Sequence, residues 1–137
     1  MLFLTADEVN QALPMRDLIA AVKDAFRALS SGDALLPLRS QIEMEEKQGA
    51  ALFMPAYLPG NEKQASLTMK AVTAFRRNPQ HGLPTIHAAV LVLNPENGQI
   101  EALLEGGRLT ALRTGAASGV ATDLLANKET PVAALFG

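Results

Sequence analysis

Three basic residues occupy positions where a positive charge needs an explanation. Lys70 lies within an alternating segment, residues 67–75, on the same face as Thr68 and Val72 and with apolar neighbours. A lysine on a half-buried strand is costly unless its ammonium group reaches solvent or a partner. The pattern therefore fits an amine that points into a concave site, and it fits equally a strand face that is simply exposed.

Arg39 and Arg113 are the other two basic residues. Arg39 opens a strand after an apolar stretch, a place where an arginine commonly just keeps an edge strand soluble. For Arg113, we expect a helix that begins near Thr110, which puts this cation in the first turn against the helix dipole. A bound carboxylate or phosphate would explain it, because the anion would meet the guanidinium group and free backbone N–H groups together. The alternative is a solvated arginine in a frayed first turn.

The residues after Arg113 are small, with Gly, Ala and Ser filling 115–119. Such residues lower helix propensity but allow another part of the backbone to approach closely. We therefore expect this helix to pack tightly against a neighbouring sheet or domain.

Two helices are predicted before the strands. Thr5 and Glu8 form a capping-box pattern at the start of the first helix, and Pro14 restarts the backbone. Apolar residues then recur at helical spacing over residues 18–29, and Gly32 follows as a stop signal.

From residue 38 onward the apolar period changes to two. About five strands are predicted, with a tight turn at 94–98, in the segments 40–44, 50–57, 67–75, 85–93 and 99–104. Hairpin-like connections favour a mixed or antiparallel sheet. Together with the two helices before it and the one after it, this gives an α+β fold.

The last residues suggest a second structural unit. Residues 132–136 form a five-residue apolar run that ends before Gly137, as in the first strand of a dinucleotide-binding (Rossmann) domain. We therefore divide the chain into a substrate-binding and oligomerisation domain, 1–128, and the first strand of a truncated Rossmann domain, 129–137. A parallel strand without neighbours should be frayed or paired with another chain. The alternative is an ordinary C-terminal strand.

Composition excludes several classes of function. The net charge is −2 with no basic patch, which argues against nucleic-acid and membrane-surface binding, and 48% of residues are hydrophobic. The sequence has no cysteine, so disulfides and thiolate chemistry are excluded, and its two histidines show no metal-ligand spacing. No signal peptide or membrane span is apparent, and we expect a cytoplasmic protein with no metal.

Taken together, these features resemble the N-terminal part of the ornithine cyclodeaminase and mu-crystallin family. The resemblance extends over essentially the whole chain, and its most specific part is Leu-Thr-Ala-Leu-Arg-Thr-Gly-Ala-Ala-Ser at 109–118. Weaker matches in the same order are Met-Pro-Ala-Tyr at 54–57, Thr-Met-Lys-Ala-Val at 68–72, Gly-Leu-Pro-Thr at 82–85 and Asn-Gly at 97–98.

The resemblance implies roles for particular residues. Arg39, Lys70 and Arg113 match positions that gather around the substrate carboxylate, and Lys70 is the candidate catalytic residue. Thr85, Arg113 and Thr114 match positions that approach the dinucleotide. Neighbouring cations and desolvation would then lower the pKa of Lys70 and favour proton exchange with a substrate nitrogen.

The implied function is NAD- or NADP-dependent chemistry at the carbon–nitrogen bond of a small amino or imino acid, in a homodimer. Family members include cyclodeaminases, ketimine or imine reductases and amino-acid dehydrogenases. Their glycine-rich loop and catalytic aspartate would lie beyond residue 137, so we expect this chain alone to be inactive. Two alternatives are a mu-crystallin-like ligand-binding protein and a fragment that retains only self-association.

Overall fold

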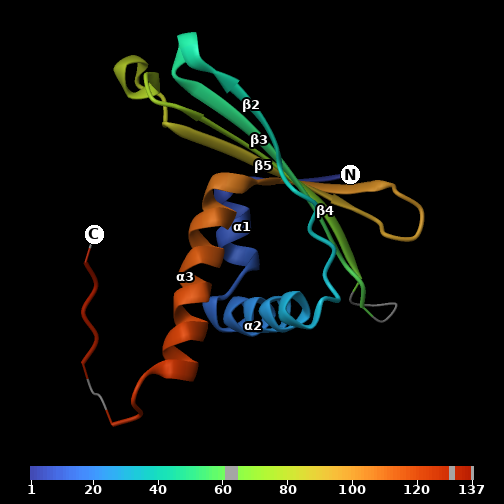
Figure 1. Ribbon diagram of the computed structural model, residues 1–137, viewed down its shortest axis with the longest axis vertical. Coiled ribbons are helices and arrows are strands. Elements are labelled where there is room, and N and C mark those ends of the chain that lie inside the picture. Colours follow the sequence, from blue (N-terminus) through green and yellow to red (C-terminus); the bar gives the residue numbers. More distant parts are fainter. Residues whose placement is uncertain (61–64, 130–131, 137) are drawn as a thin grey trace.

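One sheet and the helices on one side of it make up the structure, a computed structural model that describes residues 1–60, 65–129 and 132–136. Figure 1 shows the sheet as a single twisted layer, with α1, α2 and α3 all on the same side. The predicted α+β class is confirmed.

The sheet contains six strands in the order β1-β6-β5-β4-β3-β2. Their bounds are Leu2–Leu4 for β1, Ser40–Met44 for β2, Gly49–Leu58 for β3, Ser66–Phe75 for β4, Ile86–Leu93 for β5 and Ile100–Glu105 for β6. Neighbours pair antiparallel except β1, which runs parallel to β6, so the sheet is mixed as predicted. The sequence did not reveal β1, because three residues are too few to show an alternating pattern.

The two N-terminal helices are α1, Ala6–Ala12, and α2, Met15–Ser31. The predicted capping box is present, with Thr5 Oγ1 accepting from the Glu8 N–H and Glu8 accepting from the Thr5 N–H. At the other end of α2, Gly32 adopts a φ of 82°, which favours glycine, and its N–H closes the last turn. Short 3-10 helices cover η1, Glu45–Lys47, and η2, Asn78–His81.

The predicted start of the third helix was wrong. We expected it near Thr110, but α3 spans Gly106–Leu125 and begins directly after β6. Glu105 caps it, because its carboxylate accepts from the N–H groups of Gly107 and Arg108 at 2.8 and 2.7 Å. Arg113 is therefore two turns inside the helix, and the argument from free N–H groups and the helix dipole does not apply to it.

Glycine is required where α3 leaves the sheet. A Cβ atom on Gly106 would lie 2.7 Å from the carbonyl carbon of Ala88 and 2.8 Å from the nitrogen of Ala89. These are backbone atoms of β5, which cannot move aside as a flexible side chain can. Gly106 therefore fixes the distance between the start of α3 and the sheet.

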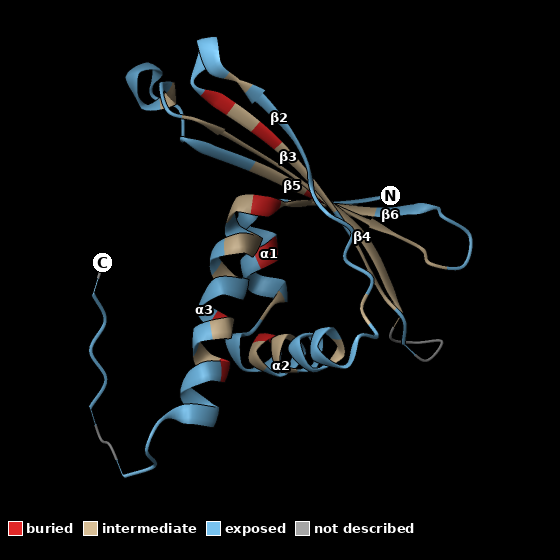
Figure 2. Cartoon of the chain, viewed as in Figure 1, coloured by how far each residue is buried: buried red, intermediate tan, exposed pale blue. Residues whose placement is uncertain are grey.

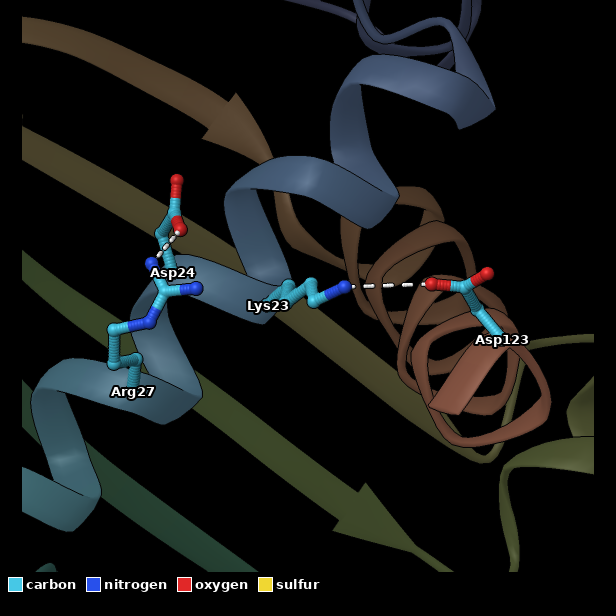
Figure 3. Close-up of polar contacts among 4 residues, drawn as sticks. All are labelled: Lys23, Asp24, Arg27 and Asp123. Carbon is cyan, nitrogen blue, oxygen red and sulfur yellow. Dashed lines mark hydrogen bonds and ion pairs between the residues drawn. The ribbon is translucent and has the colours of Figure 1, made fainter. Parts of the chain in front are cut away.

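Farther along, α3 packs against α2. Gly119 faces Ile19, whose Cδ1 atom would lie 2.7 Å from an added Cβ, while Ala116 and Val120 are buried. The small residues thus serve close helix packing. Lys23 of α2 also contacts Asp123 of α3 at 3.3 Å (Figure 3), an exposed pair that contributes at most about 1 kcal/mol.

The buried core is small. Figure 2 shows few buried positions, and the buried hydrophobic residues are Val9, Leu18, Ala51, Val90, Ala116 and Val120. The sheet face opposite the helices is here called the outer face, and none of the described helices lies over it. In the described part of the chain, no helix is long and apolar enough to cross a bilayer.

The C-terminal apolar segment forms no strand. Residues 132–136 are extended and exposed, with Leu135 at 99% and Phe136 at 92% relative exposure, and they run apart from the sheet in Figure 1. Whether this segment pairs with another chain, as the second half of the expectation has it, stays a prediction. Gly137, the last residue of the predicted Rossmann segment, lies outside the described residues, as do residues 130–131.

Candidate functional site

Lys70 lies on the face of the sheet that α3 covers. It pairs with Met54 of β3 and Val90 of β5, so its direct neighbours across the sheet are uncharged. Its Nζ donates a hydrogen bond to Oγ1 of Thr110 in α3, at 2.7 Å. The sequence left open whether Lys70 faces solvent or a concave site, and the structure places its side chain, half-buried, between the sheet and the helix.

The electrostatic setting of Lys70 disfavours its charge. Burial lowers the pKa of Lys70, and the positive charge of Arg113 lowers it further. Within residues 1–60, 65–129 and 132–136, the ion pairs are Lys23–Asp123 and Arg27–Asp24, so neither Lys70 nor Arg113 has a carboxylate partner there. Two neighbouring cations without an anion are suited to receive one.

An apolar groove of about 310 Å³ lies to one side of Lys70. The groove lies between α2 and the end of the β3–β4 hairpin. Of the residues that line it, Arg113 is the charged one. Its lining residues are Val22, Ala25, Phe26, Leu29, Ala34, Leu36, Ala56, Tyr57, Leu58, Ser66, Thr68 and Arg113. The groove therefore offers one guanidinium group beside a largely apolar wall.

A second hollow, of about 560 Å³, lies beside α3 on the other side of Lys70. It is called the α3 hollow below, and its lining residues are Val72, Ile86, Gly107, Thr110, Ala111, Thr114, Gly115 and Ser118. Thr68 lines the groove and Val72 lines the α3 hollow, and Lys70 stands between them on the same face of β4. The lysine thus occupies the ridge between the two spaces.

Arg39 is exposed and immediately precedes β2. Because Ser40 pairs with Phe53 and Met54 pairs with Lys70, Arg39 continues the row of residues that contains Lys70, two strands away. That separation is roughly 10 Å between backbones. In the described part of the chain, the Arg39 guanidinium group makes no hydrogen bond or ion pair, so the structure does not join it directly to Lys70 and Arg113.

The three candidate cofactor residues lie in different settings, with Arg113 in the lining of the apolar groove. Thr114 lines the α3 hollow, and its Oγ1 donates to the carbonyl oxygen of Thr110 at 2.7 Å. Thr85 is exposed and precedes β5, where its carbonyl accepts from the Phe75 N–H, and the next residue, Ile86, lines the hollow instead. The structure therefore brings Thr114 and Lys70 to adjacent spaces but leaves the Thr85 side chain outside them.

Sequence reasoning missed Thr110 as a functional candidate. The residue stands inside the most specific motif, but it was used only to mark the expected start of a helix. Once α3 is known to begin at Gly106, Thr110 falls one turn into the helix and faces β4. The signal that could have identified Thr110 was its position four residues after Gly106, once the start of the helix was correctly placed there. Among the described residues, no group of three or more metal-ligating side chains occurs.

Comparison with known proteins gives a consistent picture. The model of the ornithine cyclodeaminase/mu-crystallin family matches residues 1–137. Among curated proteins, the rat ketimine reductase mu-crystallin is 32% identical over 139 residues, covering 98% of this chain and 44% of that protein.

Solved structures agree with this relationship. The Thermococcus litoralis Δ1-pyrroline-2-carboxylate reductase, in complex with NADH and L-proline, is 42% identical with a TM-score of 0.84, over 95% of this chain and 39% of that one. An archaeal alanine dehydrogenase dimer with bound NAD is 36% identical with a TM-score of 0.84, over 95% of this chain and 38% of its own. The chain thus spans about 40% of the length of these relatives.

Proposed function

We propose that this chain, which belongs to the ornithine cyclodeaminase/mu-crystallin family, forms the substrate side of an NAD(P)-linked oxidoreductase acting on the C–N bond of an amino or imino acid. The observation that carries the proposal is the pair of cations, Lys70 and Arg113, without a carboxylate partner in the described chain and beside an apolar groove. The names of the relatives, which include a pyrroline-2-carboxylate reductase and an alanine dehydrogenase, support the reaction class.

Arg113 and Lys70 are proposed to hold the substrate carboxylate. An arginine presents a fixed fork of donors to a carboxylate, while a lysine supplies a compact point charge. The incoming negative charge would offset the repulsion between the two cations and raise the pKa of Lys70. Arg39, in the same row of the sheet, is proposed as the third cation, and it would reach the carboxylate across β3.

Lys70 is also proposed to exchange a proton with the substrate nitrogen. An amine whose pKa is lowered by burial and by Arg113 releases a proton more readily than a solvent-exposed lysine does. The nicotinamide cofactor, when bound, supplies or accepts the hydride. The protein residues then hold the acid group, orient the carbon–nitrogen bond and keep water from it.

The α3 hollow fits part of a dinucleotide. Its helix wall consists of small residues, including Gly107, Ala111 and Gly115, so a flat group would meet little steric resistance. Thr114, in the hollow, and Arg113, in the neighbouring apolar groove, are proposed as the cofactor contacts, with Thr85 at the rim. The exposed apolar run 132–136 supports the further proposal that residues 129–137 belong to a dinucleotide-binding domain.

Self-association through the outer face is proposed as well. Strand register places large apolar residues on this face, opposite the helices, and they are Phe3, Phe53, Met69, Leu91 and Leu103. Phe3 is 60% exposed, and an uncovered apolar surface of this kind marks an interaction site. A homodimer agrees with the dimer named for the alanine dehydrogenase relative.

The test joins residues 1–137 to the part of the Thermococcus litoralis relative that this chain does not cover. Oxidation of NADH or NADPH is followed with Δ1-pyrroline-2-carboxylate as substrate. The 137-residue chain alone is assayed in the same way as a control. We expect turnover only in the joined protein, and no NADPH fluorescence quenching by the isolated chain at micromolar cofactor. Ligand binding without turnover in a folded, cofactor-loaded protein would instead favour a mu-crystallin-like binding role.

A further inference from the structure

We propose that Thr110 is a positioning residue that holds the amine of Lys70 on the ridge between the apolar groove and the α3 hollow. The inference rests on the proposed function only in taking Lys70 as the group that acts on the substrate. The contact itself is a hydrogen bond of 2.7 Å from Lys70 Nζ to Thr110 Oγ1, in a partly buried setting.

The direction of this hydrogen bond is fixed by a second one. A threonine hydroxyl has one hydrogen and two acceptor lone pairs. Thr110 Oγ1 donates its hydrogen to the carbonyl oxygen of Gly106, at 2.6 Å. Its oxygen therefore acts only as an acceptor toward Lys70, and one N–H of the amine is directed at α3.

The position of Thr110 is fixed in turn by the sheet. Gly106 lies against the backbone of β5 at Ala88 and Ala89, so the first turn of α3 sits at its closest approach to the sheet. Thr110 comes one turn later, above β4, where Lys70 emerges. A lysine side chain is a flexible stem of four methylene groups, and this one contact selects the rotamers that keep the amine at the ridge.

Thr110 directs the amine without neutralising it. The hydroxyl group is uncharged, the charged residue that acts on Lys70 from α3 is Arg113, and the paired neighbours Met54 and Val90 carry no charge. A hydrogen bond to the ammonium form favours that form, so Thr110 opposes the effects of burial and of Arg113. The remaining N–H groups of Lys70 stay available to a ligand.

Other hydroxyl residues of α3 show what is particular to Thr110. Thr114, Ser118 and Thr122 also donate to carbonyl oxygens four residues earlier, at 2.7, 3.4 and 2.9 Å. A purely helical role would make Thr110 one of this series. The Lys70 contact distinguishes it, and Thr122, far from Lys70 on the same helix, provides a matched control.

The experiment uses the complete 137-residue chain and NMR of the lysine side chains. In the unaltered protein, NMR gives the pKa of Lys70 and, at a pH below that pKa, the rate at which its Nζ protons exchange with water, with the exposed Lys47 as an internal reference that no variant should change. In Thr110→Val, the exchange should speed up and the pKa of Lys70 should fall below its value in the unaltered protein. Thr110→Ser should restore both properties, and Thr122→Val should change neither.

Two results would overturn the inference. One is the absence of nuclear Overhauser contacts between the Cε protons of Lys70 and the Thr110 side chain in the unaltered chain, which needs no variant to fold. The other is a folded Thr110→Val chain whose Lys70 exchanges and titrates as in the unaltered protein. Neither result bears on whether Lys70 acts on a substrate, which the kinetic test of the proposed function decides separately.

Discussion

Replacing Gly106 by alanine should destabilise the fold, although alanine is the better helix former. The new Cβ would lie 2.7 Å from the carbonyl carbon of Ala88, 2.8 Å from its Cβ and 2.8 Å from the nitrogen of Ala89. Backbone atoms of a central strand cannot give way without moving β5, and overpacking of this kind costs about 1–3 kcal/mol. The gain in helix propensity is below about 1 kcal/mol at the first position of a helix. We therefore expect a net loss of about 1–2 kcal/mol.

The control is the same substitution at Gly115, on the same helix. Its added Cβ would lie 3.7 Å from Met15 Cε, an ordinary contact, so Gly115→Ala should raise the free energy of unfolding by about 0.5–1 kcal/mol. Urea unfolding followed by circular dichroism compares the two variants with the unaltered chain. A Gly106→Ala chain as stable as Gly115→Ala would refute the argument that β5 fixes the start of α3.

Three further predictions concern the site and the outer face. Lys70→Met should raise the free energy of unfolding at pH 7, because it removes a partly buried charge. This gain should shrink as the pH rises through the lowered pKa of Lys70 toward the ordinary lysine value of 10.5, since the folded protein then loses the charge while the unfolded chain still carries it. In the joined NAD(P)-linked protein, the same substitution should lower kcat/KM by at least about a hundredfold. Arg113→Ala should raise the pKa of Lys70, measured by NMR, because it removes a neighbouring positive charge. It should also weaken carboxylate binding by about ten- to a hundredfold while the helical circular dichroism signal is retained. Unchanged affinity together with an unchanged titration of Lys70 would point to a solvated arginine. Leu91→Glu should reduce self-association measured by light scattering, and a particle mass equal to that of the unaltered chain would exclude the outer face as the interface.

Much of the fold was predictable from the sequence because local signals agreed with tertiary contacts. The capping box at Thr5, the stop at Gly32 and the alternating segments all mark elements whose ends depend on nearby residues. The strand β1 could not be predicted, since it exists only through its pairing with β6, about a hundred residues away in sequence. Its three residues carry no period of their own.

The start of α3 was mispredicted for a related reason. Two consecutive glycines at 106–107 lower helix propensity, so the sequence favours a loop there. The tertiary fold decides otherwise, because Gly106 must pack against β5 and Glu105 caps the exposed N–H groups. A local rule failed where close packing against the sheet required glycine.

The site was predictable in part. An isolated lysine among apolar strand residues left a concave site and an exposed face both open, and the structure places Lys70 half-buried, with Arg113 close enough to lower its pKa. The Thr110 contact could not be predicted, because the direction in which each side chain of α3 points depends on where the helix begins. Arg39 remains a proposed partner, because its position follows from strand register and not from a contact.

The most direct test of the account is the titration of Lys70 with and without a carboxylate ligand. The pKa of Lys70 in the 137-residue chain is measured by NMR in three samples of matched ionic strength. One contains no ligand, one contains L-proline, and one contains L-prolinamide, which lacks the carboxylate. If Lys70 and Arg113 form a carboxylate site, the pKa of Lys70 lies below the ordinary lysine value of 10.5 in the free chain, rises with L-proline and shows no comparable change with L-prolinamide. An ordinary pKa in the free chain, or the same response to both ligands, would contradict the proposal that Lys70 and Arg113 form a carboxylate site.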